Sequence, residues 1–288
     1  PVRRCFLMYL DSGYIRDGDI DPWRLFSAED ITQAVREAGE GIEERIEAMH
    51  EVIAQDTCPD VAIGSHCSNP YYCPLYEECR GFLPEHNIFE LYQGGRKALE
   101  LFNSGVYAIK DIPSDCLLNE KQEIQRNCIL EGNQHVNREA ISGFLADLKY
   151  PLYFLDFETF SPAIPLFDGT SPYQAIPFQF SLHVVEEPDG LLQHHSFLAE
   201  GTADPRYRLL TELASVIGTE GNIIVYNSSF EKAILRKLGE SFPEYADWVD
   251  GVCERIVDLL VPFRSFHYYH RDQRGSASLK KVLPALTG

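Results

Sequence analysis

Two acidic residues, two positions apart, interrupt an apolar, β-prone run near the middle of the chain. Asp156 and Glu158 alternate with Leu155 and Phe157. A strand here would turn both carboxylates to one face, roughly 6–7 Å apart, and both apolar side chains toward a core. Two carboxylates on a buried strand are costly unless cations neutralise them, and a pair of divalent metal ions about 3.5–4 Å apart both neutralises such acids and hydrolyses phosphodiesters. The alternative is an ordinary polar strand face.

A second group of polar residues follows a short apolar strand predicted over residues 222–226. Asn227 would turn the chain there, and Glu231 falls on the first turn of the next helix. One interpretation is structural, because Ser228 and Glu231 have the spacing of a capping box, in which the carboxylate satisfies a helix-terminal amide. The other is that Glu231 brings a third carboxylate to the carboxyl end of the strand, beside the first pair.

The segment 57–86 is rich in cysteine, proline and tyrosine and shows no clear period. Cys67, Cys73 and Cys79 are spaced six positions apart within it. Thiolates at this density typically bind zinc or an iron–sulfur cluster, although free thiols remain an alternative. The candidates for a fourth ligand are Cys58, Cys5 and His66.

The chain carries a formal net charge of −19. This charge argues against a protein that coats nucleic acid nonspecifically, because phosphate binding depends on Lys and Arg. The stretch 264–281 is an exception, since it mixes basic and aromatic residues in a way that suits the binding of single-stranded nucleic acid. The alternative is a solvated loop and helix start. Its basic residues are Arg264, Arg271, Arg274, Lys280 and Lys281, and its tyrosines are Tyr268 and Tyr269.

Hydrophobic periodicity predicts a mainly helical first half and a second half of strands and helices in alternation. The first half is expected to begin with the end of a strand or an extended segment over 1–14, whose apolar part is 5–10. Helices are expected over 27–55, 88–102 and 119–148, with Gly132 and Gly143 as weak points. A domain boundary is expected near 149–151. Beyond it, strands are expected over 152–158, 178–185, 191–198 and 222–226, and helices over 206–217, 228–239 and 276–286. This order predicts an α/β domain with a mixed sheet and flanking helices.

The two acidic motifs together resemble the DEDD family of 3′–5′ exonucleases, which have the ribonuclease H-like fold. The resemblance rests on Asp-x-Glu at 156–158, Asn-x-x-Phe-Glu at 227–231, and the segments 256–260 and 278–283 that follow. It covers roughly residues 152–288 and is closest to an uncharacterised bacterial branch in which this domain follows a RecB-like nuclease region.

The resemblance implies a catalytic role for four acids and Mg²⁺ or Mn²⁺ as cofactor. Asp156 would bridge two metal ions, Glu158 would hold the ion on the nucleophile side, and Glu231 would complete the coordination. Asp258 would act beside them, although an acid in an apolar run is also typical of helix capping. The implied substrate-binding residues are Asn227, Arg271, Arg274 and Lys280.

Two features depart from the family pattern. Glu231 stands where most of the superfamily has Asp, one methylene shorter. The family's final Asp normally lies downstream of the helix that begins near Ser278, and no residue up to 288 replaces it. We therefore expect the sequence to be part of a longer protein and the acidic site to need a further acid.

The cysteine segment is similar to the C-terminal cysteine cluster of RecB-like nucleases of the Cas4 and AddB type. This resemblance extends weakly through residues 1–113. It implies a [4Fe–4S] cluster held by three close cysteines and a distant one, with Zn²⁺ as the alternative. The spacing in that family is tighter than the spacing of six seen here. The implied ligands are Cys58, Cys67, Cys73 and Cys79.

The expected organisation is a RecB-like, mainly helical cysteine-cluster region over 1–150 and a ribonuclease H-like exonuclease domain over 151–288. The expected activity is metal-dependent hydrolysis of nucleic acid, DNA rather than RNA, in repair or defence. The rival is a noncatalytic nucleic-acid-binding or scaffold module with a degenerate site, and a phosphodiesterase for a small nucleotide is a further alternative. No apolar run approaches the ~18–20 residues of a membrane helix, and no secretory leader opens the chain. A cytoplasmic location is expected.

Overall fold

The computed structural model describes residues 2–57 and 59–287, in two compact units. The first unit comprises Pro1–Ser65 and Phe160–Ile176, and the second His66–Thr159 and Pro177–Gly288. The second unit contains residues from both sides of position 150, so the domain boundary near 149–151 stays a prediction. Among the described residues, no helix combines the length and the apolar character that crossing a membrane requires.

The first unit contains a two-stranded antiparallel sheet and three helices. The strands are β1 (Phe6–Leu10) and β2 (Phe26–Asp30), and the helices are α1 (Pro22–Leu25), α2 (Thr32–Gly39) and α3 (Ile42–Ile53). The single helix predicted over 27–55 is therefore wrong. Its first residues pair with β1, and Gly41 adopts a φ of +65° that breaks the remaining helix in two. The alternative of a strand in the apolar part 5–10 is confirmed.

The loop 161–175 belongs to this first unit and is held by Arg16. The guanidinium of Arg16 donates hydrogen bonds to the carbonyls of Pro165 and Leu166 at 3.0 and 2.6 Å. The backbone of Arg16 also bonds to Gly169 and Thr170.

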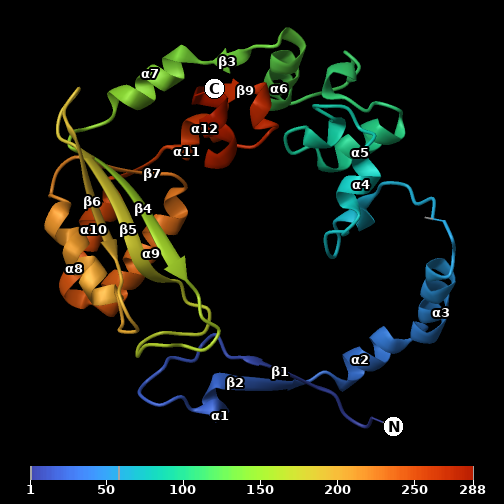
Figure 1. Cartoon of the computed structure of the whole chain (residues 1–288), viewed down its shortest axis with the longest axis horizontal. Helices are drawn as coiled ribbons and strands as arrows, with labels where there is room; N and C mark the ends of the chain where they lie inside the picture. Colours follow the sequence, from blue (N-terminus) through green and yellow to red (C-terminus); the bar gives the residue numbers. More distant parts are fainter. Residues whose placement is uncertain (1, 58, 288) are drawn as a thin grey trace. The chain divides into compact units, whose positions relative to one another are not determined.

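The second unit is built on a five-stranded mixed sheet of order β6-β5-β4-β7-β8 (Figure 1). β7 is parallel to β4 and β8, and β5 is antiparallel to β6. Helices α8, α9 and α10 lie on one side of the sheet (Figure 1). The predicted mixed α/β class is confirmed. The strands are β4 (Leu152–Phe160), β5 (Ile176–Val185), β6 (Leu192–Leu198), β7 (Asn222–Val225) and β8 (Ile256–Asp258), and the helices are α8 (Arg206–Val216), α9 (Ser228–Ser241) and α10 (Ala246–Glu254).

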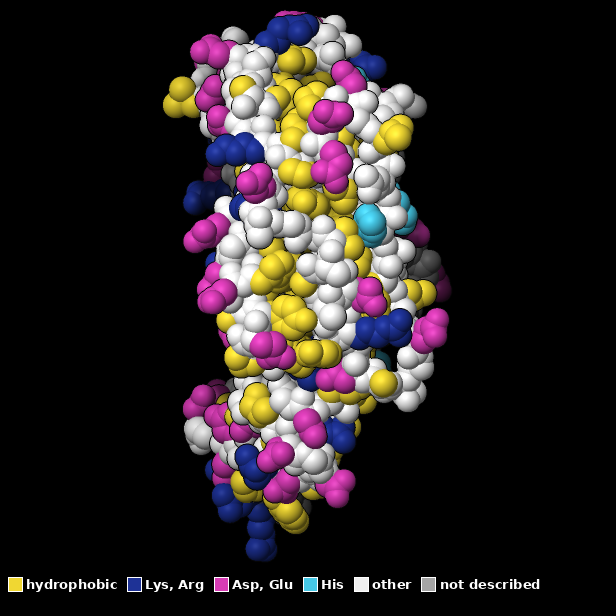
Figure 2. All heavy atoms as spheres, turned by 90° about the vertical axis from the view of Figure 1, so that its left-hand side faces the viewer, with side chains coloured by type: hydrophobic (Ala, Val, Ile, Leu, Met, Phe, Trp, Pro, Cys, Tyr) yellow, Lys and Arg dark blue, Asp and Glu magenta, His cyan; other side chains and the backbone are white. Residues whose placement is uncertain are grey.

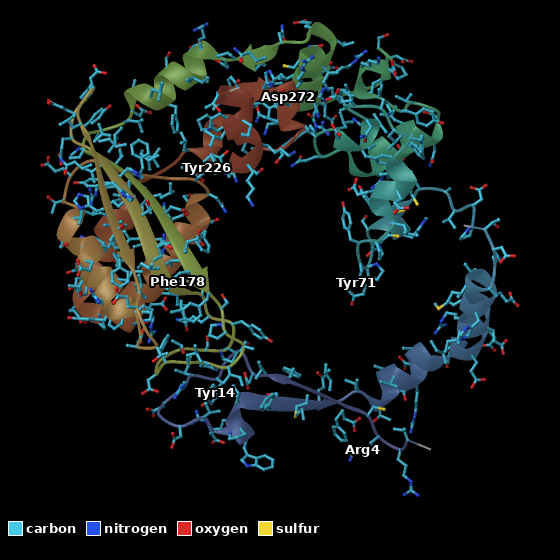
Figure 3. All side chains as sticks on the ribbon, viewed as in Figure 1. Arg4, Tyr14, Tyr71, Phe178, Tyr226 and Asp272 are labelled. Carbon is cyan, nitrogen blue, oxygen red and sulfur yellow. The ribbon has the colours of Figure 1, made fainter. Side chains whose placement is uncertain are left out.

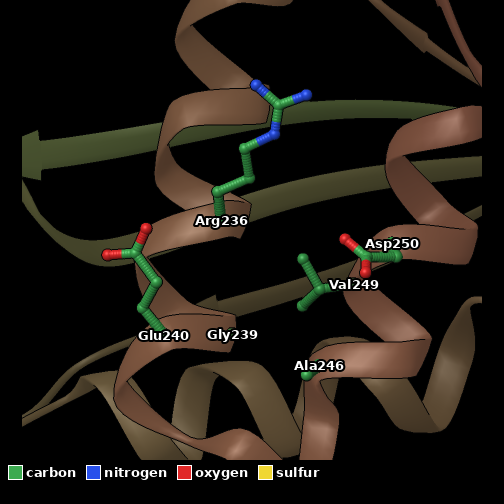
Figure 4. A pocket seen from close by; sticks show the side chains of 6 residues that line it. All are labelled: Arg236, Gly239, Glu240, Ala246, Val249 and Asp250. Carbon is green, nitrogen blue, oxygen red and sulfur yellow. The ribbon is translucent and has the colours of Figure 1, made fainter.

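The sheet buries alternate side chains against these helices, as the period of two in β4 and β5 predicts. Leu155 and Phe157 are buried on β4, and Phe180 and Leu182 on β5. Helix α9 contributes a buried stripe at Ile234, Leu235 and Leu238. α9 also packs closely on α10, since Gly239 faces Val249 beside a shallow pocket (Figure 4).

The rest of the second unit joins residues 66–147 to the end of the chain. β3 (Gln134–Val136) pairs antiparallel with β9 (Tyr268–His270), and Cys128, Phe266 and Tyr269 form a buried cluster beneath this pair. The helices are α4 (Tyr76–Arg80), α5 (Gly95–Asn103), α6 (Glu120–Glu131), α7 (Arg138–Ala146), α11 (Leu260–Arg264) and α12 (Leu279–Thr287). Short 3-10 helices are η1 (Ser65–Cys67), η2 (Ile88–Glu90), η3 (Ile109–Asp111), η4 (Pro243–Tyr245) and η5 (Arg271–Gln273).

The continuous helices predicted over 88–102 and 119–148 are wrong in extent. In the first segment, α5 begins only at Gly95. In the second, Gly132 ends α6 in the left-handed conformation, with φ +67°, and the next residues pair with β9. Gly132 was thus a real break, whereas Gly143 lies inside α7.

Gly221, just before β7, lies very close to the backbone of Pro151. It precedes β7 with a φ of +81°, and an added Cβ would lie 2.0 Å from the carbonyl oxygen of Pro151. We expect Gly221→Ala to lower the free energy of unfolding by more than about 3 kcal/mol, through strain and displacement of β4 from β7. Urea unfolding measures this loss. Gly251→Ala is the matched control, since open space surrounds its Cβ position within α10; equal midpoints for the two variants would contradict the close approach.

Candidate metal centre

Asp156 and Glu158 lie on the exposed face of β4. The strand alternates as predicted, with Leu155 and Phe157 buried and both acids exposed, together with Phe154. The shared face of the two carboxylates is thereby confirmed. The face that carries the two acids is open to solvent, which fits the alternative of a polar strand face, because Phe154, Asp156 and Glu158 are all exposed. Both side chains therefore have room to change rotamer.

Asn227 makes the turn between β7 and α9, as predicted. Its φ is +81°, in the left-handed region that asparagine adopts more readily than most residues. The turn directs the backbone N–H groups of Asn227 and Ser228 to the carboxylate of Asp258, at 2.9 and 3.1 Å. The first amides of α9 are thus capped by an acid from a different strand.

The capping box predicted between Ser228 and Glu231 is not formed. The N–H of Ser228 bonds to Asp258, and the Ser228 hydroxyl donates to the same oxygen at 3.2 Å. Because Asp258 already caps the helix, Glu231 is not needed for that purpose. The structural interpretation of Glu231 as a cap is therefore wrong, while the capping interpretation of Asp258 is right.

Both oxygens of Asp258 are engaged by backbone and hydroxyl donors. In addition to the bonds from Asn227 and Ser228, the N–H of Leu260 donates to Oδ1 at 3.0 Å. Burial raises the pKa of Asp258, but these hydrogen bonds outweigh burial and hold the pKa below its ordinary value. Asp258 is therefore a charged positioning residue for α9 and α11.

Asp258→Ala should remove these bonds together and leave the N–H groups of Asn227, Ser228 and Leu260 without this acceptor. We expect the free energy of unfolding to fall by about 2–3 kcal/mol at pH 7, because hydrogen bonds to a charged group and helix caps are both lost. The pKa of Asp258 is lower in the folded state than in the unfolded state, where it is 3.8. The stabilisation by Asp258 is therefore fully present above pH 3.8 and is lost as the pH falls through the pKa of the folded state. Urea unfolding at pH 7 and pH 3 measures it; an equal difference at both pH values would contradict this role.

Glu231 is a buried acid with an unsatisfied oxygen. Its side chain is the first member of the stripe by which α9 packs on the sheet, and the residue is 3% exposed. No described residue donates a hydrogen bond to its Oε2. Burial raises the pKa of Glu231 to about 7, and the carboxylates of Asp156 and Asp258 add to the rise. Carboxylates from β4 and β8 thus act on the buried carboxyl of α9.

Tyr226 connects this region to the C-terminal helix and was not among the predicted site residues. It directly follows β7 in the chain, and its hydroxyl donates a hydrogen bond to the carbonyl of Ala277 at 2.5 Å. Tyr226 lies between the sheet and α12 (Figure 3). Burial, with a smaller effect from Asp258, raises the pKa of Tyr226 to about 12. A tyrosine as the last residue of an apolar strand was the available sequence signal.

The carboxylates suit a hard divalent cation in their chemistry, although the site is not preassembled. Carboxylate oxygens are the ligands that Mg²⁺ and Mn²⁺ prefer. The raised pKa of Glu231 means that its carboxyl group readily holds a proton, and a bound cation would take the place of that proton. Within residues 2–57 and 59–287, no three His, Cys, Asp or Glu side chains are arranged to hold a metal ion together. Ion binding therefore requires Asp156 and Glu158 to turn toward Glu231.

The predicted cysteine site is described only in part, because Cys58 lies outside the described residues. Cys67 and Cys73 are half-buried, and Cys79 is exposed on α4. The N–H of Cys73 bonds to the carbonyl of Cys67 at 2.9 Å, which folds the segment back on itself. The alternative ligand Cys5 belongs to the first unit. None of the described cysteines is in a disulfide bond.

The basic stretch 264–281 is partly neutralised by its neighbours. Arg274 lies 3.5 Å from Glu85 and 3.3 Å from Glu90, and Arg271 lies 3.7 Å from Asp272. Its tyrosines, Tyr268 and Tyr269, are buried and so cannot stack on the bases of single-stranded nucleic acid. Lys280, by contrast, is exposed on α12. Asp and Glu side chains are spread over the face drawn in Figure 2.

Residues 153–278 match the family model described as a domain of unknown function, DUF2779. This span includes both acidic motifs, Tyr226 and Asp258. No curated protein and no solved structure matches the chain.

Proposed function

We propose that the chain is a metal-dependent phosphodiesterase that hydrolyses nucleic acid from a 3′ end, on a ribonuclease H-like fold. The observation that carries the proposal is Glu231, a buried acid without a donor at Oε2 that lies near two further carboxylates. Such an arrangement is costly unless a cation or proton neutralises it. Asp156 and Glu158 on the adjacent strand face supply the remaining acidic ligands.

In this proposal each acid has a separate role. Asp156, Glu158 and Glu231 would hold Mg²⁺ or Mn²⁺, and the bound ions would activate water and stabilise the leaving 3′ oxygen. Asp258 holds the first turn of α9 and so fixes the position of Glu231. Tyr226 holds the segment before α12, which bears Lys280, a candidate contact for phosphate.

The finer parts of the proposal depend on the resemblance to DEDD exonucleases. These parts are the preference for DNA, the 3′–5′ direction and a role in repair or defence. The resemblance to RecB-like nucleases adds a [4Fe–4S] cluster, or Zn²⁺, at Cys58, Cys67, Cys73 and Cys79. A cytoplasmic location is part of the same proposal, because the cytosol keeps such thiols reduced.

The test is cleavage of a 5′-labelled single-stranded nucleic acid by the purified protein at its full natural length, which would supply the further acid that the site is expected to need. With Mn²⁺ we expect progressive shortening of the label-bearing fragments, and EDTA should stop it. A substrate whose last linkages at the 3′ end are phosphorothioates should resist degradation, whereas the same block at the 5′ end should have no effect. Lack of Mn²⁺-dependent cleavage of both DNA and RNA would contradict the proposal.

The rival function is a noncatalytic nucleic-acid-binding or scaffold module. Two observations favour it: the carboxylates do not already converge on one point, and both oxygens of Asp258 are occupied by amides. Calorimetric titration with Mn²⁺ distinguishes the two, since a degenerate site should bind Mn²⁺ no more tightly than about millimolar. Submillimolar binding that is lost in Glu231→Gln would favour the enzyme.

A further inference from the structure

Two histidines face each other across the β5–β6 hairpin, in a place that the proposed function does not use. His183 on β5 and His194 on β6 occupy directly opposite positions in the antiparallel register. Opposite side chains in such a pair have Cβ atoms about 4.5–5.5 Å apart, which is close enough to share one ligand.

The imidazole rings of this pair are aligned. Their centroids are 4.3 Å apart and their planes differ by 19°, so the two rings are stacked with their faces toward one another. The face that carries them is the one opposite the buried Leu182 and Val184 of β5, and both rings can be reached by solvent. A small tilt of the rings would bring one nitrogen from each to the separation of neighbouring ligands on a metal ion.

Ser181 fixes one of the rings. Its hydroxyl lies 3.0 Å from Nε2 of His194, also across the two strands. Metal-binding histidines usually donate their second ring N–H to an oxygen, which sets the tautomer and the ring orientation. If Nε2 of His194 donates to the Ser181 oxygen, Nδ1 of His194 carries the free lone pair.

We propose that His183 and His194 form a second metal site, which binds one borderline transition-metal ion such as Zn²⁺, Ni²⁺ or Cu²⁺. Neutral imidazole nitrogens suit these ions, whereas Mg²⁺ prefers carboxylate and water oxygens. Water completes the coordination. With two protein ligands in place of the three or four found in most zinc sites, this site binds more weakly than those do. The site is independent of the carboxylates of the proposed nuclease centre.

The test is the number of Ni²⁺ ions that the full chain binds in equilibrium dialysis at pH 7.5. His183→Ala and His194→Ala should each lose about one equivalent relative to the parent chain, and the difference separates this site from any ion bound at the cysteines. His195→Ala is the matched control, because His195 pairs with Leu182 on the other face of the hairpin and should keep full binding. Asp156→Asn should also keep it, which makes the outcome independent of the nuclease proposal.

Two further measurements separate metal binding from simple ring packing. Cu²⁺ bound at the pair should show nitrogen splitting in its electron paramagnetic resonance spectrum, and His194→Gln should reduce the number of coupled nitrogens by one. Ser181→Ala should weaken Ni²⁺ binding several-fold while the thermal midpoint stays that of the parent. Unchanged Ni²⁺ stoichiometry in both alanine variants, or an equal loss in His195→Ala, would overturn the proposal.

Discussion

Asp156→Asn is expected to lower the rate of Mn²⁺-dependent cleavage by on the order of 10³-fold, because it removes the charge of the acid proposed to bridge both metal ions. The substitution keeps the size of the side chain and one carbonyl oxygen. The residue is exposed on β4, so the free energy of unfolding should change by no more than about 0.5 kcal/mol. A loss of activity without a loss of stability is the signature of a ligand, as opposed to a structural acid.

Initial rates on the labelled strand, together with urea unfolding of the same preparations, measure these two quantities. Glu187→Gln is the matched control, since it also removes one exposed carboxylate from the second unit but lies in the turn between β5 and β6. Its rate should equal that of the parent chain. Cleavage that survives in Asp156→Asn at the parent rate would exclude the proposed metal centre.

Glu231→Gln is expected to abolish activity and yet stabilise the protein in the absence of metal. The pKa of Glu231 is raised from 4.5 to about 7 in the folded state, so the folded chain binds this proton more tightly than the unfolded chain does. The stability that results is complete below pH 4.5 and is lost as the pH rises through 7. At pH 8 the glutamate is ionised and buried, whereas glutamine stays neutral, and the variant should be more stable by about 2–3 kcal/mol.

Urea unfolding between pH 4.5 and pH 8 in EDTA measures this difference, which should be small at the acid end and grow with pH. Mn²⁺ should stabilise the parent chain but not the variant, because binding to the folded state shifts the unfolding equilibrium. Glu212→Gln removes an exposed acid of α8 and should behave as the parent chain at every pH. A lower free energy of unfolding for Glu231→Gln than for the parent chain at pH 8 would show that the carboxylate of Glu231 already has hydrogen-bond donors in the folded protein.

The elements around Asp156 could be predicted because local patterns determine them. The strand that turns both acids to one face, the strands predicted over 178–185 and 191–198, α8, β7 and α9 all follow from alternation and helical spacing. Asn227 was identifiable as the turn residue because few side chains tolerate a left-handed conformation. The family match to residues 153–278 covers these elements.

Contacts between distant segments could not be predicted from local patterns. Residues 26–30 read as the start of a helix, yet they form β2 because β1 offers them a partner. Residues 134–136 likewise pair with β9 in place of continuing α6. The cap of α9 comes from Asp258, 30 residues beyond Ser228, so the local capping-box spacing at Ser228 and Glu231 was misleading.

The pairing of β3 with β9 bears on how the protein can be divided for study. An expression fragment that begins at residue 151 would keep all the proposed catalytic acids but would lack Gln134–Val136, the partner of β9. It would also lack Cys128, which packs with Phe266 and Tyr269 in a buried cluster. The backbone of β9 would then have no strand partner in the fragment. Such an unpaired strand edge invites intermolecular pairing. Fragments meant for crystallisation or assay should therefore start before α6, at or upstream of Asn119, and not at the start of the sheet.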